Sequence, residues 1–134
     1  MNQQDNNMEM NGCPVDWADV YGRIGDASII AEFAVSFLRN SQTLMLSLKS
    51  AVNTHSIDQI ELYAHALKGS ASNMGAIMLA KKSWLLEKDA ADKNIDNAVE
   101  LLNEIESEYL ILKSLLEYPD WVERAKRAAE MKVS

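Results

Sequence analysis

The stretch that decides the fold is SIDQIELYAHALKGSASNMG, residues 56–75. Its apolar residues recur at steps of 3, 4, 3, 4 and 3, the spacing of one buried stripe along an α-helix. Ser56 and Gln59 form a capping-box pattern at its start, and Gly75 stands where a glycine commonly ends a helix. The stretch therefore predicts a helix over 57–74, whose inward residues are Ile57, Ile60, Ala64, Leu67, Ala71 and Met74.

Upstream of this helix the sequence predicts two more. Segment 15–24 has helical spacing and is ended by Gly25. Asp26 is expected to cap the next helix, because its carboxylate can accept a backbone N–H. We interpret Asn40-Ser41 as a kink or break in that helix. The inward positions expected on these segments are Trp17, Val20, Tyr21, Ile24, Ile30, Phe33, Phe37, Leu44, Leu48 and Ala51.

Downstream, a helix is predicted over 76–91, and Asn94 is expected to cap the last long helix, which Pro119 ends. Segment 120–131 has mixed charge and is interpreted as a short solvated helix. The inward positions expected here are Leu79, Leu86, Ala90, Ile95, Ala98, Leu102, Ile105, Tyr109, Leu112 and Leu116.

Four long amphipathic segments with short connections, and no alternating strand pattern, predict an all-α fold. We expect an up-down-up-down four-helix bundle with a short N-terminal helix covering one end. The predicted division of the chain is a disordered polar tail over 1–13, the bundle over 14–118 and a short C-terminal helical extension over 119–134.

Composition excludes several classes of function. A net charge of −7 argues against nucleic acid and anionic membrane surfaces. No apolar run approaches a membrane span, and the start of the chain does not have the pattern of a secretory signal. Two histidines and the single Cys13 offer no metal-ligand pair, and the five isolated glycines form no nucleotide loop. We expect a cytoplasmic monomer with no cofactor and no ATP site of its own.

His65 breaks the pattern of its helix. At 100° per residue it lies roughly 130° from the centre of the apolar stripe, with Gly69 roughly 170° and Lys68 roughly 70° away. It therefore stands on the outer face of a central helix. The alternative is an ordinary solvated histidine, which is also how we interpret His55 in its turn.

Two neighbours make His65 chemically distinctive. Gly69 lies one turn later and costs about 1 kcal/mol of helix stability relative to alanine, but it bares the ring to another protein. Lys68 can bring its ammonium toward a group attached to that ring. Because a neutral imidazole is a good nucleophile near pH 7, these residues suit a surface that accepts a phosphoryl group.

Residues 65–76, HALKGSASNMGA, resemble the signature of the histidine-phosphotransfer (HPt) family, H-x-[LFI]-K-G-[SA]-[SA]-x-x-x-G. The order and lengths of the predicted helices also resemble the family from about residue 14 to 118. The resemblance implies a phosphorelay carrier rather than an enzyme: His65 would accept a phosphoryl group from the aspartyl phosphate of a receiver domain and pass it to another receiver.

The same resemblance implies roles for the other site residues. Lys68 would offset phosphate charge, and Gly69 would give access to the imidazole. Glu87, 22 residues after the histidine, stands where family members often place a side chain that hydrogen-bonds the ring, although a solvated helix residue remains the alternative. The family also implies an apolar docking surface near the histidine, and we hypothesise that Trp17 or Tyr21 contributes to it.

The implied partners are receiver domains of response regulators, including those of hybrid sensor kinases, and Mg²⁺ is expected on the receiver. The second hypothesis is an HPt-like helical binding module that regulates a kinase or receiver without phosphotransfer. A hydrolytic or metal-dependent enzyme is disfavoured, because no ligands or carboxylates converge in the pattern.

Overall fold

The structure, a computed structural model, describes residues 14–133, with side chains described to residue 131. It contains helices and no strand within that range, so the predicted all-α class is confirmed. The predicted tail and Cys13 lie outside the described residues. The helices are α2 (Trp17–Ile24), α3 (Ala27–Asn53), α4 (Ile57–Asn73), α5 (Ile77–Ala91), α6 (Ala98–Leu116) and α7 (Trp121–Val133).

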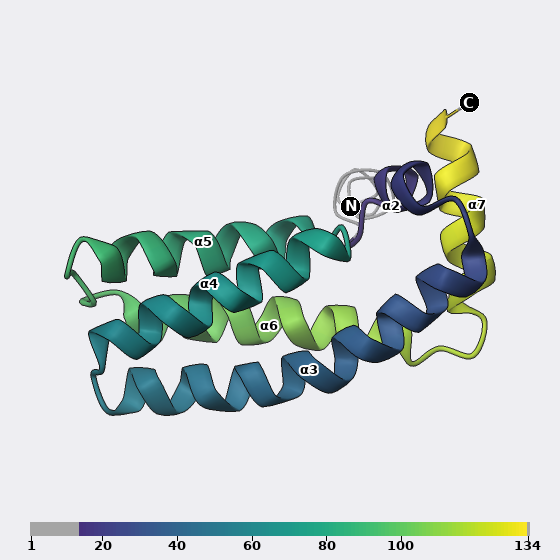
Figure 1. Ribbon diagram of the computed structural model, residues 1–134. Helices are drawn as coiled ribbons and strands as arrows, with labels where there is room; N and C mark the ends of the chain where they lie inside the picture. The colour runs from purple at the N-terminus through teal and green to yellow at the C-terminus, as the bar shows by residue number, and fades with distance from the viewer. Residues whose placement is uncertain (1–13, 134) are drawn as a thin grey trace, which may run out of the picture.

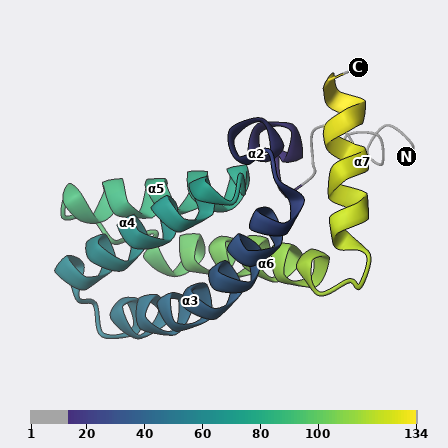
Figure 2. The same cartoon turned by 45° about the vertical axis from the view of Figure 1, so that its right-hand side comes forward.

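Helices α3, α4, α5 and α6 lie side by side, and α2 and α7 sit together at one end of this group (Figures 1 and 2). Each of the four packs against the next along the chain, and α6 also packs against α3. The turn between α4 and α5 lies at the end where α2 sits (Figure 1). None of the described helices is long and apolar enough to cross a membrane.

The core follows the predicted stripe of α4. Ile60, Ala64, Leu67 and Ala71 are all fully buried. Burying a leucine or isoleucine contributes roughly 1.5–3 kcal/mol, so this face fixes how α4 is rotated. The opposite face, which holds His65, is thereby turned away from the core.

One predicted break and one predicted core residue are wrong. Helix α3 runs through Asn40-Ser41 without interruption. Ser41 is buried, and its hydroxyl lies 3.3 Å from the Tyr109 hydroxyl, so the polar group is satisfied inside the helix. Phe33 is 44% exposed, because the small residue Ala34 occupies the buried position beside it.

The predicted helix ends are only partly right. The Asp26 carboxylate accepts hydrogen bonds from Ser28 N and Ile29 N, as expected of a cap. Ser56 precedes α4 but makes no side-chain capping bond. Asn94 does not cap α6: its side chain accepts from Asp96 N within the preceding turn, and the helix begins only at Ala98.

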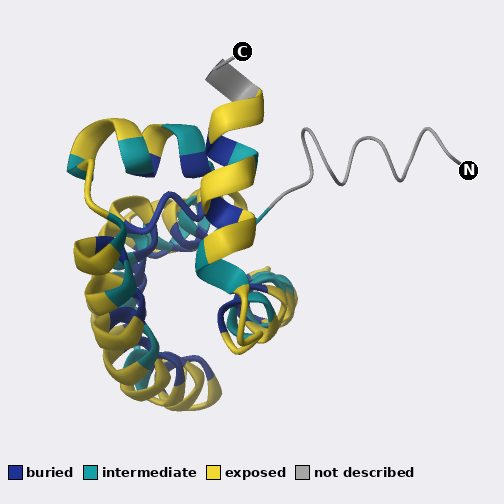
Figure 3. Cartoon of the chain, turned by 90° about the vertical axis from the view of Figure 1, so that its right-hand side faces the viewer, coloured by how far each residue is buried: buried dark blue, intermediate teal, exposed yellow. Residues whose placement is uncertain are grey.

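The mixed charge of segment 120–131 predicted a solvated helix, but one face of α7 is buried. Ala125 and Ala129 are buried, and the rings of Trp17 and Trp121 stack with centroids 5.6 Å apart. Figure 3 shows the buried positions of α7 in dark blue between exposed turns. The small alanines allow α2 and α7 to approach closely, and composition alone does not reveal that contact.

Candidate functional site

His65 lies on the outer face of α4 with 65% of its side chain exposed. The residues on either side of it in sequence, Ala64 and Ala66, are small, and Ala64 faces the core while Ala66 faces solvent. The imidazole is therefore reachable by a large molecule. Its Nδ1 atom lies 2.7 Å from Oε2 of Glu87 on α5.

Glu87 connects the two cationic or protonatable groups of the site. Its Oε1 atom forms an ion pair with Lys68 Nζ at 2.8 Å, while Oε2 faces His65. Partial burial raises the pKa of Glu87, but the hydrogen bonds and charges of Lys68 and His65 outweigh it and lower the pKa below its ordinary value. Glu87 is therefore ionised near pH 7.

An ionised carboxylate can only accept hydrogen bonds, so the Nδ1 atom of His65 must be the donor. This contact fixes the tautomer of the neutral ring and places the lone pair on Nε2. The ring is thus held by Glu87 at one nitrogen and presents the other as a nucleophile.

Lys68 lies within the site but points to a different partner from the one its spacing suggested. Its ammonium contacts Glu87, and 29% of its side chain is exposed. The structure therefore brings His65, Glu87 and Lys68 together as a chain of contacts with the carboxylate in the middle.

Gly69 lies one turn from His65 on the exposed face. A Cβ atom added there would have no neighbour within 4 Å, apart from the local helix backbone. Packing inside this chain therefore does not require a glycine at this position. The space is open to solvent beside the histidine, which is where a second protein would have to approach.

Gly75 is required by the structure for two reasons. Its φ is +69°, and an added Cβ would lie 2.6 Å from Val20 Cγ2. The backbone of Asp16 donates a hydrogen bond to the carbonyl of Gly75 at 2.9 Å. The predicted glycine at the end of α4 is confirmed, and it also lets α2 approach.

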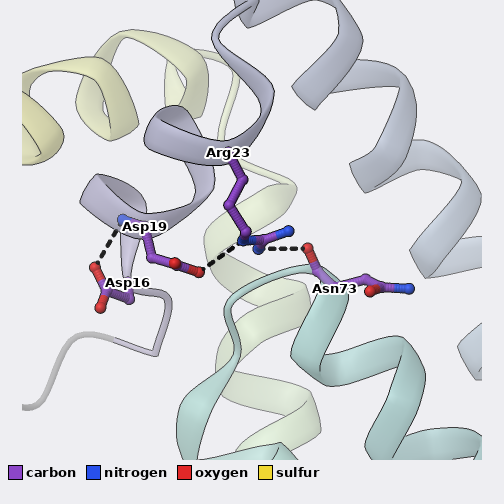
Figure 4. A network of polar contacts seen from close by, with 4 residues as sticks. All are labelled: Asp16, Asp19, Arg23 and Asn73. Carbon is purple, nitrogen blue, oxygen red and sulfur yellow. Dashed lines mark hydrogen bonds and ion pairs between the residues drawn. The ribbon is translucent and has the colours of Figure 1, made fainter.

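A polar network fastens α2 to the end of α4 (Figure 4). Arg23 donates to the Asp19 carboxylate at 3.0 Å and to the carbonyl of Asn73 at 3.1 Å. The Asp16 carboxylate accepts from Asp19 N at 3.1 Å and caps α2. A cation at the C-terminus of α4 also interacts favourably with the helix dipole.

A shallow groove of about 420 Å³ runs between the start of α2 and the facing parts of α4 and α5. It begins one turn from the histidine, at Lys68. Asp16 and Asp19 line one side, and Lys68, Ile77, Lys81 and Trp84 line the other. Trp84 is 45% exposed, with Lys88 Nζ 5.7 Å from its ring centroid.

The Hpt domain family matches residues 32–118 of the chain, which include the site on α4 and α5. The chain belongs to the Hpt domain family. Helices α2 and α7 lie outside the matched residues of this Hpt domain.

Two known proteins are similar to this Hpt chain. The crystal structure of histidine-containing phosphotransfer protein B (HptB) from Pseudomonas aeruginosa PAO1 superposes with a TM-score of 0.71 at 24% identity, covering 86% of this chain and 96% of that one. Pseudo histidine-containing phosphotransfer protein 2 from Oryza sativa subsp. japonica is 24% identical over 92 residues, which is 67% of this chain. The aligned part spans 61% of the rice protein.

Sequence reasoning missed part of the surface of this Hpt domain. Trp17, expected near the docking surface, is 4% exposed and buried against Trp121. Trp84 was not singled out, although it lies one position beyond the buried Ser83 and so faces outward. His55 is exposed in the turn between α3 and α4, away from the site residues. Among the residues that the structure describes, no cluster of potential metal ligands occurs.

Proposed function

We propose that this Hpt domain accepts a phosphoryl group on Nε2 of His65 from the aspartyl phosphate of one receiver domain and passes it to an aspartate of another. The observation that carries the proposal is the exposed imidazole whose Nδ1 is held by the ionised Glu87. In the first transfer a P–N bond forms as the P–O bond to aspartate breaks, and the electron pair of that bond leaves on the aspartate. The second transfer reverses these changes.

The neighbours of His65 act on charge and access. Phosphorylation at Nε2 leaves the proton on Nδ1 and increases the positive character of the ring, which the Glu87 carboxylate offsets. Lys68, which is paired with the same carboxylate that holds His65, shares its charge between Glu87 and a phosphoryl oxygen in this proposal. Gly69 leaves room for the receiver to bring its aspartate in line with Nε2.

The partner supplies the remaining chemistry. Phosphoryl transfer depends mainly on positioning and on charge stabilisation. We propose that the receiver brings Mg²⁺ and its carboxylates, and that this chain acts as a cytoplasmic monomer without an ATP site or a metal of its own.

We further propose that α3–α6 form the up-down-up-down four-helix bundle of a carrier, with α2 covering one end. The side-by-side course of the four helices in Figures 1 and 2 and the packing of each on its neighbour support this arrangement. The bundle holds α4 and α5 in register, so that Glu87 meets His65 across them.

The second candidate is a binding module that regulates a kinase or receiver without phosphotransfer. The printed name of the rice relative, pseudo histidine-containing phosphotransfer protein 2, is the reason to keep this candidate. The intact set of His65, Lys68 and Glu87 favours the carrier, because a binding surface alone does not require an oriented imidazole.

One experiment separates the two. The protein is mixed with ³²P-phosphorylated receiver domains, and the chain is analysed for acid-labile, alkali-stable label. We expect label on the wild type and on His55→Gln, which removes the other histidine, and none on His65→Gln. Label that persists in a folded His65→Gln protein, or no label on the wild type with any receiver of the same genome, would refute the carrier proposal.

A further inference from the structure

The groove beside His65 has walls of opposite charge. On the α2 side stand the carboxylates of Asp16 and Asp19, and Asp19 is paired with Arg23. On the α4–α5 side stand the ammonium groups of Lys81 and of Lys68, which is paired with Glu87. With these pairs counted, the α2 side keeps one net negative charge and the α4–α5 side one net positive charge. The apolar surface of the groove comes from Ile77 and Trp84 on the α4–α5 side, which are 53% and 45% exposed. A partner that fills the groove therefore needs an apolar face with a basic group toward α2 and an acidic group toward the lysines of α4 and α5.

The acidic wall is rigidly held. Asp16 is anchored through its backbone to Gly75, and Asp19 through Arg23 to the carbonyl of Asn73. The stacked Trp17 and Trp121 rings hold α2 from the other side. Because this wall is fixed before a partner arrives, its charges require little reordering on binding.

The wall also lies outside residues 32–118, the part of the chain that the family matches. The residues that carry the phosphoryl chemistry and the residues that make the acidic wall therefore come from different segments, and the wall can differ between carriers with the same chemistry. Charges at the rim of an interface mainly affect the association rate and the choice of partner.

We infer that Asp16 and Asp19 select among receiver domains, favouring those with a Lys or Arg beside the apolar face that enters the groove. This inference rests on the proposed function. The receiver's own carboxylates belong at the His65 end, where Lys68 stands, which orients the receiver so that its basic group meets α2.

The test removes the two charges without disturbing the wall. In Asp16→Asn/Asp19→Asn, the amide at position 16 still caps α2, because Asn is as good an N-cap as Asp, and the side-chain carbonyl introduced at position 19 can still accept from Arg23. The matched control is Asp92→Asn/Asp96→Asn, which changes the net charge equally in the turn after α5. Asp16 is hydrogen-bonded just before the start of α5, at Gly75, and the control follows the end of this 15-residue helix, roughly 22 Å away, which exceeds the Debye length of roughly 14 Å at 50 mM salt.

Each variant is phosphorylated with phosphoramidate, a small donor that needs no docking surface, and then mixed with a panel of purified receiver domains of the same genome. We expect equal phosphoramidate labelling in all variants. With the receivers that the wild type prefers, Asp16→Asn/Asp19→Asn should transfer about threefold to tenfold more slowly at 50 mM NaCl, and the deficit should disappear at 500 mM. The control should transfer like the wild type.

Two results would overturn the inference: unchanged receiver preference in Asp16→Asn/Asp19→Asn, or an equal loss in the control. Failure of the proposed function gives a different result, namely no phosphoramidate label on wild-type His65. In that case the same variants are compared for receiver binding by fluorescence anisotropy, where a selective, salt-sensitive loss still supports the role of the wall and its absence refutes it.

Discussion

Replacing Gly69 with alanine should make this Hpt domain more stable and a poorer carrier. In the interior of a helix alanine is favoured over glycine by about 0.8–1 kcal/mol. A Cβ at Gly69 would meet nothing within 4 Å, so no steric cost reduces that gain. The expected rise in the free energy of unfolding is therefore close to 1 kcal/mol, or about 3–5 °C in Tm for a chain of this size.

The same methyl group narrows the approach to the imidazole of His65. We expect Gly69→Ala to slow transfer from a phosphorylated receiver by about threefold to tenfold, and Gly69→Leu to slow it further, because Leu is nearly as good a helix former but much bulkier. Labelling by phosphoramidate should change less in both variants, since the small donor needs less space.

Urea unfolding measures the first effect and rapid-quench transfer kinetics measures the second. The reasoning fails if Gly69→Ala lowers stability, which would mean that the glycine serves packing or backbone geometry. It also fails if folded Gly69→Leu transfers as fast as the wild type, because the open space would then have no part in receiver access.

The other predictions concern stability. Gly75→Ala should lower the free energy of unfolding by roughly 2–4 kcal/mol in urea, because alanine at positive φ is strained and its Cβ would press on Val20. Trp121→Ala should cost about 1–3 kcal/mol and lower Tm, since it removes the stacking partner of Trp17; an unchanged Tm would show that α7 does not hold α2. Glu87→Gln should be less stable than the wild type at pH 7. Because the folded pKa of Glu87 is lowered, its stabilisation is fully present above the ordinary value of 4.5 and is lost as pH falls through the folded pKa. The difference between the two proteins, followed by urea unfolding from pH 7 to 3, should therefore shrink below about pH 4.5; a constant difference would contradict the ion pairs.

The central helix was predictable because its signals agree. The apolar stripe of α4 and the glycine after it both result from local rules, and each is found where expected. Local rules failed where a residue distant in sequence determines whether a position is buried or a helix continues. By local rules Ser41 resembles a helix breaker, but its hydroxyl donates a hydrogen bond to Tyr109, 68 residues away in sequence. Phe33 is more apolar than Ala34, but close packing buries the smaller Ala34.

The site shows the same division. The angle of His65 on its helix follows from the spacing of α4 alone, and so does the outward position of Gly69. The pairing of Lys68 with Glu87 does not, because it depends on how α5 packs against α4. The acidic wall was not foreseen for a similar reason: it forms only when α2 is folded back onto the end of α4 and held there by α7.

Under the proposed function, the ion pair between Lys68 and Glu87 affects how long a phosphoryl group stays on His65. In the resting protein the lysine already has an anionic partner at 2.8 Å. A phosphoryl group on His65 must therefore compete for that cation, and it gains less than it would from an unengaged lysine. A phosphohistidine that is only moderately stabilised suits an intermediate in a series of transfers, because strong stabilisation would slow transfer to the next aspartate.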